Sequence, residues 1–167
     1  MNVPLTISGL GLSGIVLFLN LRTWWRGKRE IKNLKSFGLG ALGGASLLLC
    51  VGGIFRWVAI KTVSTNSAAG GVVVSKATGV QGSGFLAHGS MGVITVAGAW
   101  ILLLAIVGIG FIWYGANKVD RHRMLGGAYC GVTLCATAGI AHLMAWLPSI
   151  YNGLGGLIAS VLSGKAL

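Results

Sequence analysis

The stretch from Ala99 to Trp113, AWILLLAIVGIGFIW, decides the fold class of this chain. It holds no charged residue, and apolar residues extend it in both directions to Met91–Tyr114. A helix needs about 20 mostly apolar residues to cross the hydrocarbon core of a bilayer. The stretch therefore predicts a membrane-spanning helix over Met91–Tyr114.

The composition of the whole chain leads to the same class of protein. Of 167 residues, 54% are hydrophobic and only 9% are charged, whereas a soluble domain carries about 25% charged residues. So few charges cannot cover the surface of a protein in water. The 29 glycines come with only 2 prolines and no triplet repeat, which excludes a collagen-like chain and leaves glycine-rich membrane helices.

Three further apolar segments predict membrane-spanning helices, at Leu5–Leu21, Phe37–Ile60 and Met124–Leu147, the last ending before Pro148. The expected fold class is thus an all-α integral membrane protein with four transmembrane helices in two helical hairpins. In the first segment the basic residues follow the apolar run, which is the reverse of a signal peptide. We therefore expect it to remain as the first helix.

The chain divides into four expected parts. The first hairpin covers residues 1–61 and the second covers 91–148, with a Gly/Ser/Thr-rich external linker at 62–90 and an apolar, glycine-containing tail at 149–167 that we do not count as a span. Within the linker, residues 71–74 could form a short strand or hairpin and Gly79–Gly84 a turn. The second helices of both halves begin with LGGA, which indicates either an internal duplication or chance.

The charge pattern predicts the orientation of these helices. The net charge is +11, with 13 Lys and Arg against Glu30 and Asp120. Short cytoplasmic loops of membrane proteins are enriched in Lys and Arg, so both basic loops belong in the cytoplasm and both termini outside, in a bacterial inner membrane. The Lys and Arg residues of the two basic loops are also the expected contacts for anionic phospholipid head groups or, as a more specific alternative, for nucleic-acid phosphates. They are Arg22, Arg26, Lys28, Arg29, Lys32, Lys35, Lys118, Arg121 and Arg123.

Glycine spacing predicts close helix packing. Without a hydrophobic gain between helices in lipid, small residues favour association by letting backbones approach. Glycines at every third or fourth position imply close partners on more than one face of each helix, which favours a homo-oligomer, although glycine is common in membrane helices in any case. The expected packing positions are Gly40, Gly44, Gly52, Gly98, Gly108, Gly127 and Gly131.

No arrangement of residues predicts catalysis, so we expect no enzyme activity, no cofactor and no metal site. The two acids lie in basic loops, and the three cysteines lack zinc-site spacing. His142 is interpreted as a histidine satisfied within the helix packing, with a proton relay as the alternative. Arg56 is interpreted as reaching the outer interface beside Trp57, with a functional charge as the alternative.

The segment Ile101–Leu147 resembles the VirB2/TrbC-type pilins of type IV secretion and conjugation systems. A glycine-containing helix ends in Trp113-Tyr114-Gly115, a basic turn follows at Asn117–Arg121, and the next helix opens with Leu125-Gly126-Gly127. The resemblance implies a helical hairpin with its basic turn in the cytoplasm, extracted into a pilus with lipid between subunits. This chain departs from that family in having two hairpins, no long leader and a longer first basic loop.

Three functions remain open from the sequence. The first is a non-enzymatic structural subunit of an oligomeric membrane assembly of secretion, conjugation or pilus type, with other apparatus subunits as further partners. The second is a virus-encoded membrane protein, either a holin or a virion membrane or coat protein. The third is a small channel or transporter with Arg56 and His142 in its path, although the absence of an acid in any predicted span disfavours coupled transport.

Overall fold

The structure is a computed structural model that describes residues 5–26, 31–80, 84–87 and 89–164; for residues 31–33 it describes the backbone alone. Within this part of the chain all named elements are helices. They are α1 (Ile7–Arg26), α2 (Ile31–Leu49), α3 (Gly53–Thr78), α4 (Val96–Gly115), α5 (Lys118–Cys135), α6 (Ala138–Leu143) and α7 (Trp146–Leu162).

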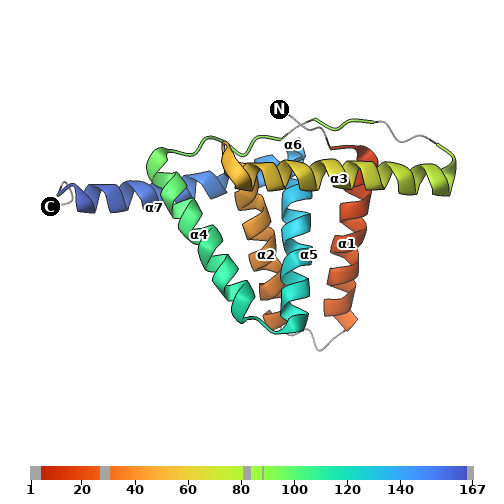
Figure 1. Ribbon diagram of the computed structural model, residues 1–167, viewed down its shortest axis with the longest axis horizontal. Helices are drawn as coiled ribbons and strands as arrows, with labels where there is room; N and C mark the ends of the chain where they lie inside the picture. Colours follow the sequence, from red (N-terminus) through yellow and green to blue (C-terminus); the bar gives the residue numbers. More distant parts are fainter. Residues whose placement is uncertain (1–4, 27–30, 81–83, 88, 165–167) are drawn as a thin grey trace.

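In the view of Figure 1, α1, α2, α4 and α5 run from top to bottom, and α3 and α7 lie across their upper ends. Helices α1, α5 and α2 stand side by side with α5 in the middle, and α4 leans against this row. Helices α3 and α7 lie across one end, which we call the crossed end. At the opposite end α1 and α4 finish and α2 and α5 begin. We call this the basic end, because Arg22, Arg26, Lys35, Lys118, Arg121 and Arg123 lie there.

Several helices are long and apolar enough to cross a membrane. By length and composition these are α1, α4 and the segment Ala138–Leu162, and a fourth candidate exists if Leu34–Leu49 and Gly53–Thr78 are taken as one bent span. The predicted all-α fold is confirmed for the described residues, and these helices are compatible with the predicted membrane protein. The pairing into two hairpins is not confirmed, since α2 packs mainly against α5, while α1 packs against α3 and α5 rather than α2.

The predicted helix Phe37–Ile60 is wrong, because the chain bends by 110° between α2 and α3. The bend uses Gly53, whose φ of +79° is in the left-handed region that favours glycine. After the bend, the Arg56 Nη1 atom donates a hydrogen bond of 2.8 Å to the Leu48 carbonyl. That bond satisfies one of the carbonyls that the end of α2 leaves without an intrahelical partner.

The short strand or hairpin expected at residues 71–74 is also wrong. Helix α3 continues through this segment to Thr78, so much of the expected linker at 62–90 is helical. Packing against α1 explains this outcome: the backbone of Ser8 lies so close to Gly70 that a Cβ there would sit 2.6 Å from it. Tertiary contact of this kind overrides weak helix propensity. Gly79, the first residue of the expected turn Gly79–Gly84, ends α3 with a φ of +72°. Residues 81–83 of that turn lie outside the described residues.

The predicted fourth helix Met124–Leu147 is wrong as a single element. Helix α5 ends at Cys135, and the loop after α3 binds the break, with hydrogen bonds from Gly89 N to Ala136 O and from Ala138 N to Ala87 O. Pro148 does not end a helix but lies in the first turn of α7, where a missing N–H costs no intrahelical bond. The expected tail therefore forms most of α7.

The other two predicted spans shift at their ends. The first helix continues beyond Leu21 to Arg26, and the third begins at Val96 rather than Met91. Thr95 precedes it as the N-cap, and its hydroxyl accepts a hydrogen bond of 3.1 Å from Gly98 N. A Thr at this position satisfies one of the free N–H groups of the first turn, which accounts for where α4 begins.

Candidate functional site

The closest helix contact lies between α2 and α5 and is built from glycine on both sides. A Cβ atom added at Gly40 would lie 2.0 Å from the carbonyl oxygen of Met124, and one at Gly44 would lie 2.1 Å from that of Ala128. In the other direction, a Cβ added at Gly127 would lie 2.1 Å from Phe37 O, and one added at Gly131 would lie 2.1 Å from Ala41 O. Because only a hydrogen atom fits at these four positions, the two backbones are in direct contact.

A second crossing joins the start of α4 to α7. A Cβ at Gly98 would lie 2.3 Å from Oδ1 of Asn152, and one at Gly155 would lie 2.5 Å from the carbonyl carbon of Ala97. The Asn152 amide also binds the chain before α4, where Oδ1 accepts from Thr95 N at 2.9 Å and Nδ2 donates to Val93 O at 3.0 Å. Gly98 thus lies in a contact between helices.

The remaining two glycines expected at packing positions lie elsewhere. Nothing comes within 4 Å of a Cβ added at Gly52, which lies in the bend before α3, or at Gly108 on α4. Both face open space within the single chain. Their proposed role in packing stays a prediction about contacts with other molecules.

The basic end brings together most of the cations expected at the head-group region. Arg22 and Arg26 lie exposed in the last turns of α1, Lys35 lies near the start of α2, and Lys118 begins α5. Lys28 and Arg29, and the side chain of Lys32, lie outside the described residues. The end of α1 and the starts of α2 and α5, which are distant in sequence, therefore contribute to one positively charged end of the molecule (Figure 1).

Arg121 fixes the corner between α4 and α5. Its Nε donates to Ala116 O at 2.9 Å, and a second guanidinium nitrogen bonds Tyr114 O. The guanidinium carbon also lies 5.5 Å from the Trp113 ring centroid and 5.9 Å from that of Tyr114. These are distances at which a cation is attracted to an aromatic face, so Arg121 caps α4 as well as carrying charge.

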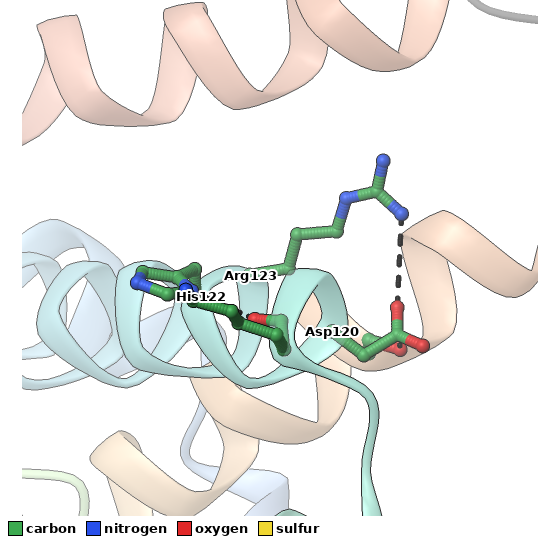
Figure 2. Close-up of polar contacts among 5 residues, drawn as sticks. Asp120, His122 and Arg123 are labelled. Carbon is green, nitrogen blue, oxygen red and sulfur yellow. Dashed lines mark hydrogen bonds and ion pairs between the residues drawn. The ribbon is translucent and has the colours of Figure 1, made fainter.

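Asp120 is the acidic residue that organises the start of α5. Its Oδ1 lies 3.7 Å from Nη1 of Arg123 and accepts a hydrogen bond of 3.2 Å from Ser36 Oγ on α2. Figure 2 shows Arg123 rising from α5 into the space between α5 and α1, with its guanidinium turned back toward Asp120. The carboxylate therefore links α5 to α2 and holds the guanidinium in place.

Arg56 and His142 do not come together. Arg56 is half-buried at the start of α3, where it caps α2 and lines a cavity of about 390 Å³. His142 lies exposed on α6 and does not line that cavity. The interpretation of His142 as a buried, satisfied histidine is wrong, because the break after α5 turns this residue outward. A single path lined by both residues has no support here.

A buried polar cluster between α1, α3 and α5 was missed from the sequence. Asn66 Nδ2 donates to Gly9 O at 2.9 Å and to Ser13 Oγ at 3.1 Å, and the Tyr129 hydroxyl donates to Asn66 Oδ1. Asn66 is 2% exposed and Ser13 is fully buried. The cluster satisfies its own hydrogen bonds and fastens α3 across α1. A signal was available in the spacing of Ala59, Val63, Asn66 and Gly70, which places all four on one helical face.

The described residues offer no group of three or more His, Cys, Asp or Glu that could hold a metal ion. The three thiols are free, with Cys130 and Cys135 buried and Cys50 half-buried. What the geometry brings together is therefore a set of packing contacts and a positively charged end. Several helices have the length and apolarity of membrane spans, which is consistent with an integral membrane protein. Comparison with known protein families, curated proteins and solved structures finds no match for this chain.

Proposed function

We propose that this chain is a non-enzymatic structural subunit of an oligomeric membrane assembly. The observation that carries the proposal is α7, which projects beyond the other helices on the side of α4 (Figure 1). Its outer half presents Leu154, Leu157, Ile158, Val161 and Leu162, all exposed. Apart from Gly155, which packs against the start of α4, this half has no buried residue and no acidic or basic residue. Its exposed apolar side chains are therefore available to a neighbouring copy.

The internal crossings support the same reading. The α2–α5 and α4–α7 contacts both rely on glycine, so this chain already uses glycine notches to bring helices together. Further notches stay open, with nothing within 4 Å of a Cβ at Gly153 and Gly156 on α7 or at Gly108 and Gly110 on α4. A second copy has both apolar side chains and notches with which to engage.

The proposed orientation follows from the two ends of the molecule. The basic end lies in the cytoplasm, as the excess of Lys and Arg in short cytoplasmic loops requires. The start of α1 and all of α7 lie at the crossed end, which puts both ends of the described chain outside (Figure 1). The resemblance of the α4–α5 segment to VirB2/TrbC-type pilins suggests a secretion, conjugation or pilus apparatus in a bacterial inner membrane as the kind of assembly.

The test is the mass of the protein in mild detergent, measured by size-exclusion chromatography with light scattering after subtraction of the detergent. We expect a homogeneous multiple of the 17.2 kDa chain. Replacing Leu157 by Gln should reduce this mass, because it places an amide on the exposed arm. The matched control is Val72→Gln on the exposed side of α3, which should leave the mass unchanged. A monomeric wild-type protein would refute the proposal.

The kind of assembly requires a separate experiment in the host cell. If the assembly is a pilus, the chain appears in filaments sheared from the cell surface. If it is an embedded apparatus, the chain stays in the membrane and co-purifies with other subunits. Loss of membrane potential on expression alone would instead identify the holin alternative.

A further inference from the structure

An apolar groove runs beside α3 at the crossed end. It has a volume of about 520 Å³ and is lined by Leu12 of α1, Tyr129 of α5 and one face of α3 between Trp57 and Ala69. The α3 residues recur every three or four positions, so they form a continuous stripe along the helix. At 1.5 Å per residue this stripe is about 20 Å long. The groove is therefore long enough to receive at least about two turns of another helix.

Three polar side chains that line the groove are engaged within the chain. The Tyr129 hydroxyl donates to Asn66 Oδ1, and the Asn66 amide donates to α1. Lys61 Nζ lies 5.9 Å from the centroid of the Trp57 ring, a distance at which a cation is attracted to an aromatic face. An occupant does not have to supply hydrogen bonds or charge to these groups, so an uncharged, apolar helix suits the groove.

The end of α7 is a helix of this kind. Beyond Gly155, which packs against the start of α4, the segment Gly156–Leu162 carries no charged residue, and we call it the arm. Its hydroxyl group, on Ser160, donates to Leu157 O at 2.8 Å. Nothing lies within 4 Å of a Cβ at Gly156, so another surface can approach the backbone there. At about 10 Å, the arm fits within the length of the groove.

The bilayer restricts which surfaces of two copies can meet. Copies inserted in the same orientation place their crossed ends at the same depth. The arm and α3 both lie across the upper ends of the other helices, so the arm and the groove are at the same depth (Figure 1). The cavity between α1, α2 and α5 lies at the opposite, basic end. The cavity lined by Arg56 is at the crossed end, but its guanidinium would face an arm that carries no acid.

We propose that the arm of one copy lies in the groove of a second copy. This inference rests on the proposed function and names the surface that receives the neighbour. Leu157 and Val161 are four residues apart and share one face of the arm, and this face packs against the α3 stripe. In lipid, helices associate through close packing, and a helix in a groove makes dispersion contacts with two walls instead of one. The arm and α3 lie outside the Ile101–Leu147 segment that resembles the pilins.

The first test is the oligomer mass of a variant with a filled groove. Ala69→Trp places an indole in the groove and should reduce the mass in mild detergent to that of one chain, 17.2 kDa. Ala68→Trp, at an exposed neighbour that does not line the groove, is the matched control and should keep the wild-type mass. Circular dichroism shows whether both variants are folded. A folded Ala69→Trp variant with the wild-type mass would overturn the proposed contact.

Mixing two variants distinguishes an arm in a groove from two paired arms. Leu157→Gln has a damaged arm and an intact groove, whereas Ala69→Trp has an intact arm and a filled groove. In the mixture the intact arm can enter the intact groove, so a complex of two chains should form from variants that are single chains alone. A third chain cannot add, because the remaining arm is damaged and the remaining groove is filled. Persistence of single chains in the mixture would refute the proposal.

Cross-linking in the membrane tests the same contact without detergent and without a bulky substitution. Leu157→Cys and Ala69→Cys are combined in a chain whose three native cysteines are alanine and whose oligomer mass equals that of the wild type. A disulfide requires two Cβ atoms about 4 Å apart, so oxidation with copper phenanthroline should join chains covalently. The pair Leu157→Cys and Ala68→Cys should stay as single chains. Equal cross-linking of both pairs would contradict the contact.

The results separate this inference from the proposed function. If the wild-type protein is an oligomer but Ala69→Trp leaves its mass unchanged and residues 157 and 69 do not cross-link, the assembly stands and the arm–groove contact is wrong. A monomeric wild-type protein would refute both.

Discussion

Replacing Gly44 by Ala should separate α2 from α5. The added Cβ would lie 2.1 Å from the carbonyl oxygen of Ala128 and 2.9 Å from Val132 N. Carbon and oxygen atoms of this kind do not approach within 3.0 Å, so the helices must move apart by at least 0.9 Å, the difference between 3.0 Å and 2.1 Å. Both atoms belong to the backbone of α5, so no side-chain rotation relieves the contact.

The expected loss of stability is about 3 kcal/mol, at the upper end of the range for overpacking a well-packed contact. The assay is reversible unfolding in mixed micelles with increasing SDS, followed by circular dichroism. Gly38→Ala on the same helix is the matched control, because nothing lies within 4 Å of a Cβ there. That variant should be neutral or stabilised by up to about 1 kcal/mol, the gain in helix propensity. If Gly44→Ala lowers stability by no more than about 0.5 kcal/mol relative to Gly38→Ala, the described α2–α5 contact is wrong.

Three further predictions concern single contacts. Asn66→Ala should destabilise the protein by about 2 kcal/mol, because it leaves the Tyr129 hydroxyl without its acceptor. It should also speed amide hydrogen exchange in α3. Thr65→Ala, at an exposed neighbour, should have neither effect. Asn152→Leu should lower the free energy of unfolding by about 1–2 kcal/mol, because it removes the acceptor of Thr95 N and Oγ1. The control is Ser149→Ala, and an equal loss of stability in both variants would argue against the α4–α7 contact. A maleimide should label half-buried Cys50 in native micelles but reach buried Cys130 and Cys135 only after unfolding, so rapid labelling of all three thiols would contradict the packing around α5.

The sequence predicts those helices of the fold whose hydropathy is unambiguous. The run Ala99–Trp113 has no charge, and it lies within α4. The basic turn that follows it predicts a reversal, and α5 does run back from the basic end (Figure 1). Hydropathy identifies such segments because lipid requires a helix to satisfy its own backbone groups.

The bend before α3 could not be predicted in this way. Gly52 and Gly53 lie within a long apolar run, where a glycine pair is equally compatible with close packing and with a turn. Only the backbone shows that Gly53 adopts a positive φ, while Gly40 and Gly44 stay helical and contact α5. The residue type is the same in both cases, so the neighbouring helices decide its role.

The candidate sites differ in the same way in how far the sequence predicts them. The cations of the basic end could be predicted because the loops that carry them flank apolar segments. An apolar cavity of about 570 Å³ between α1, α2 and α5 lies beside them. It could not be predicted, because it depends on how α1 and α2 each pack against α5. The spacing of Asn66 with Val63 and Gly70 indicates a shared helical face, but the sequence does not show what that face meets, since the partners Gly9 and Ser13 lie 57 and 53 residues away.

The position of α5 between α1 and α2 sets the order in which this protein can be completed during synthesis. Helix α1 leaves the ribosome first, yet its hydrogen-bonding partner on α3 follows 57 residues later, and Cys130 of α5 follows Ser13 by 117 residues. Until then the Ser13 hydroxyl is bonded only within α1, where it donates to Gly9 O at 3.1 Å, and neither residue has its partner on α3 or α5. We therefore expect α1 to remain next to the insertion machinery until α5 is synthesised. The helices should then pack together once α5 has inserted between α1 and α2.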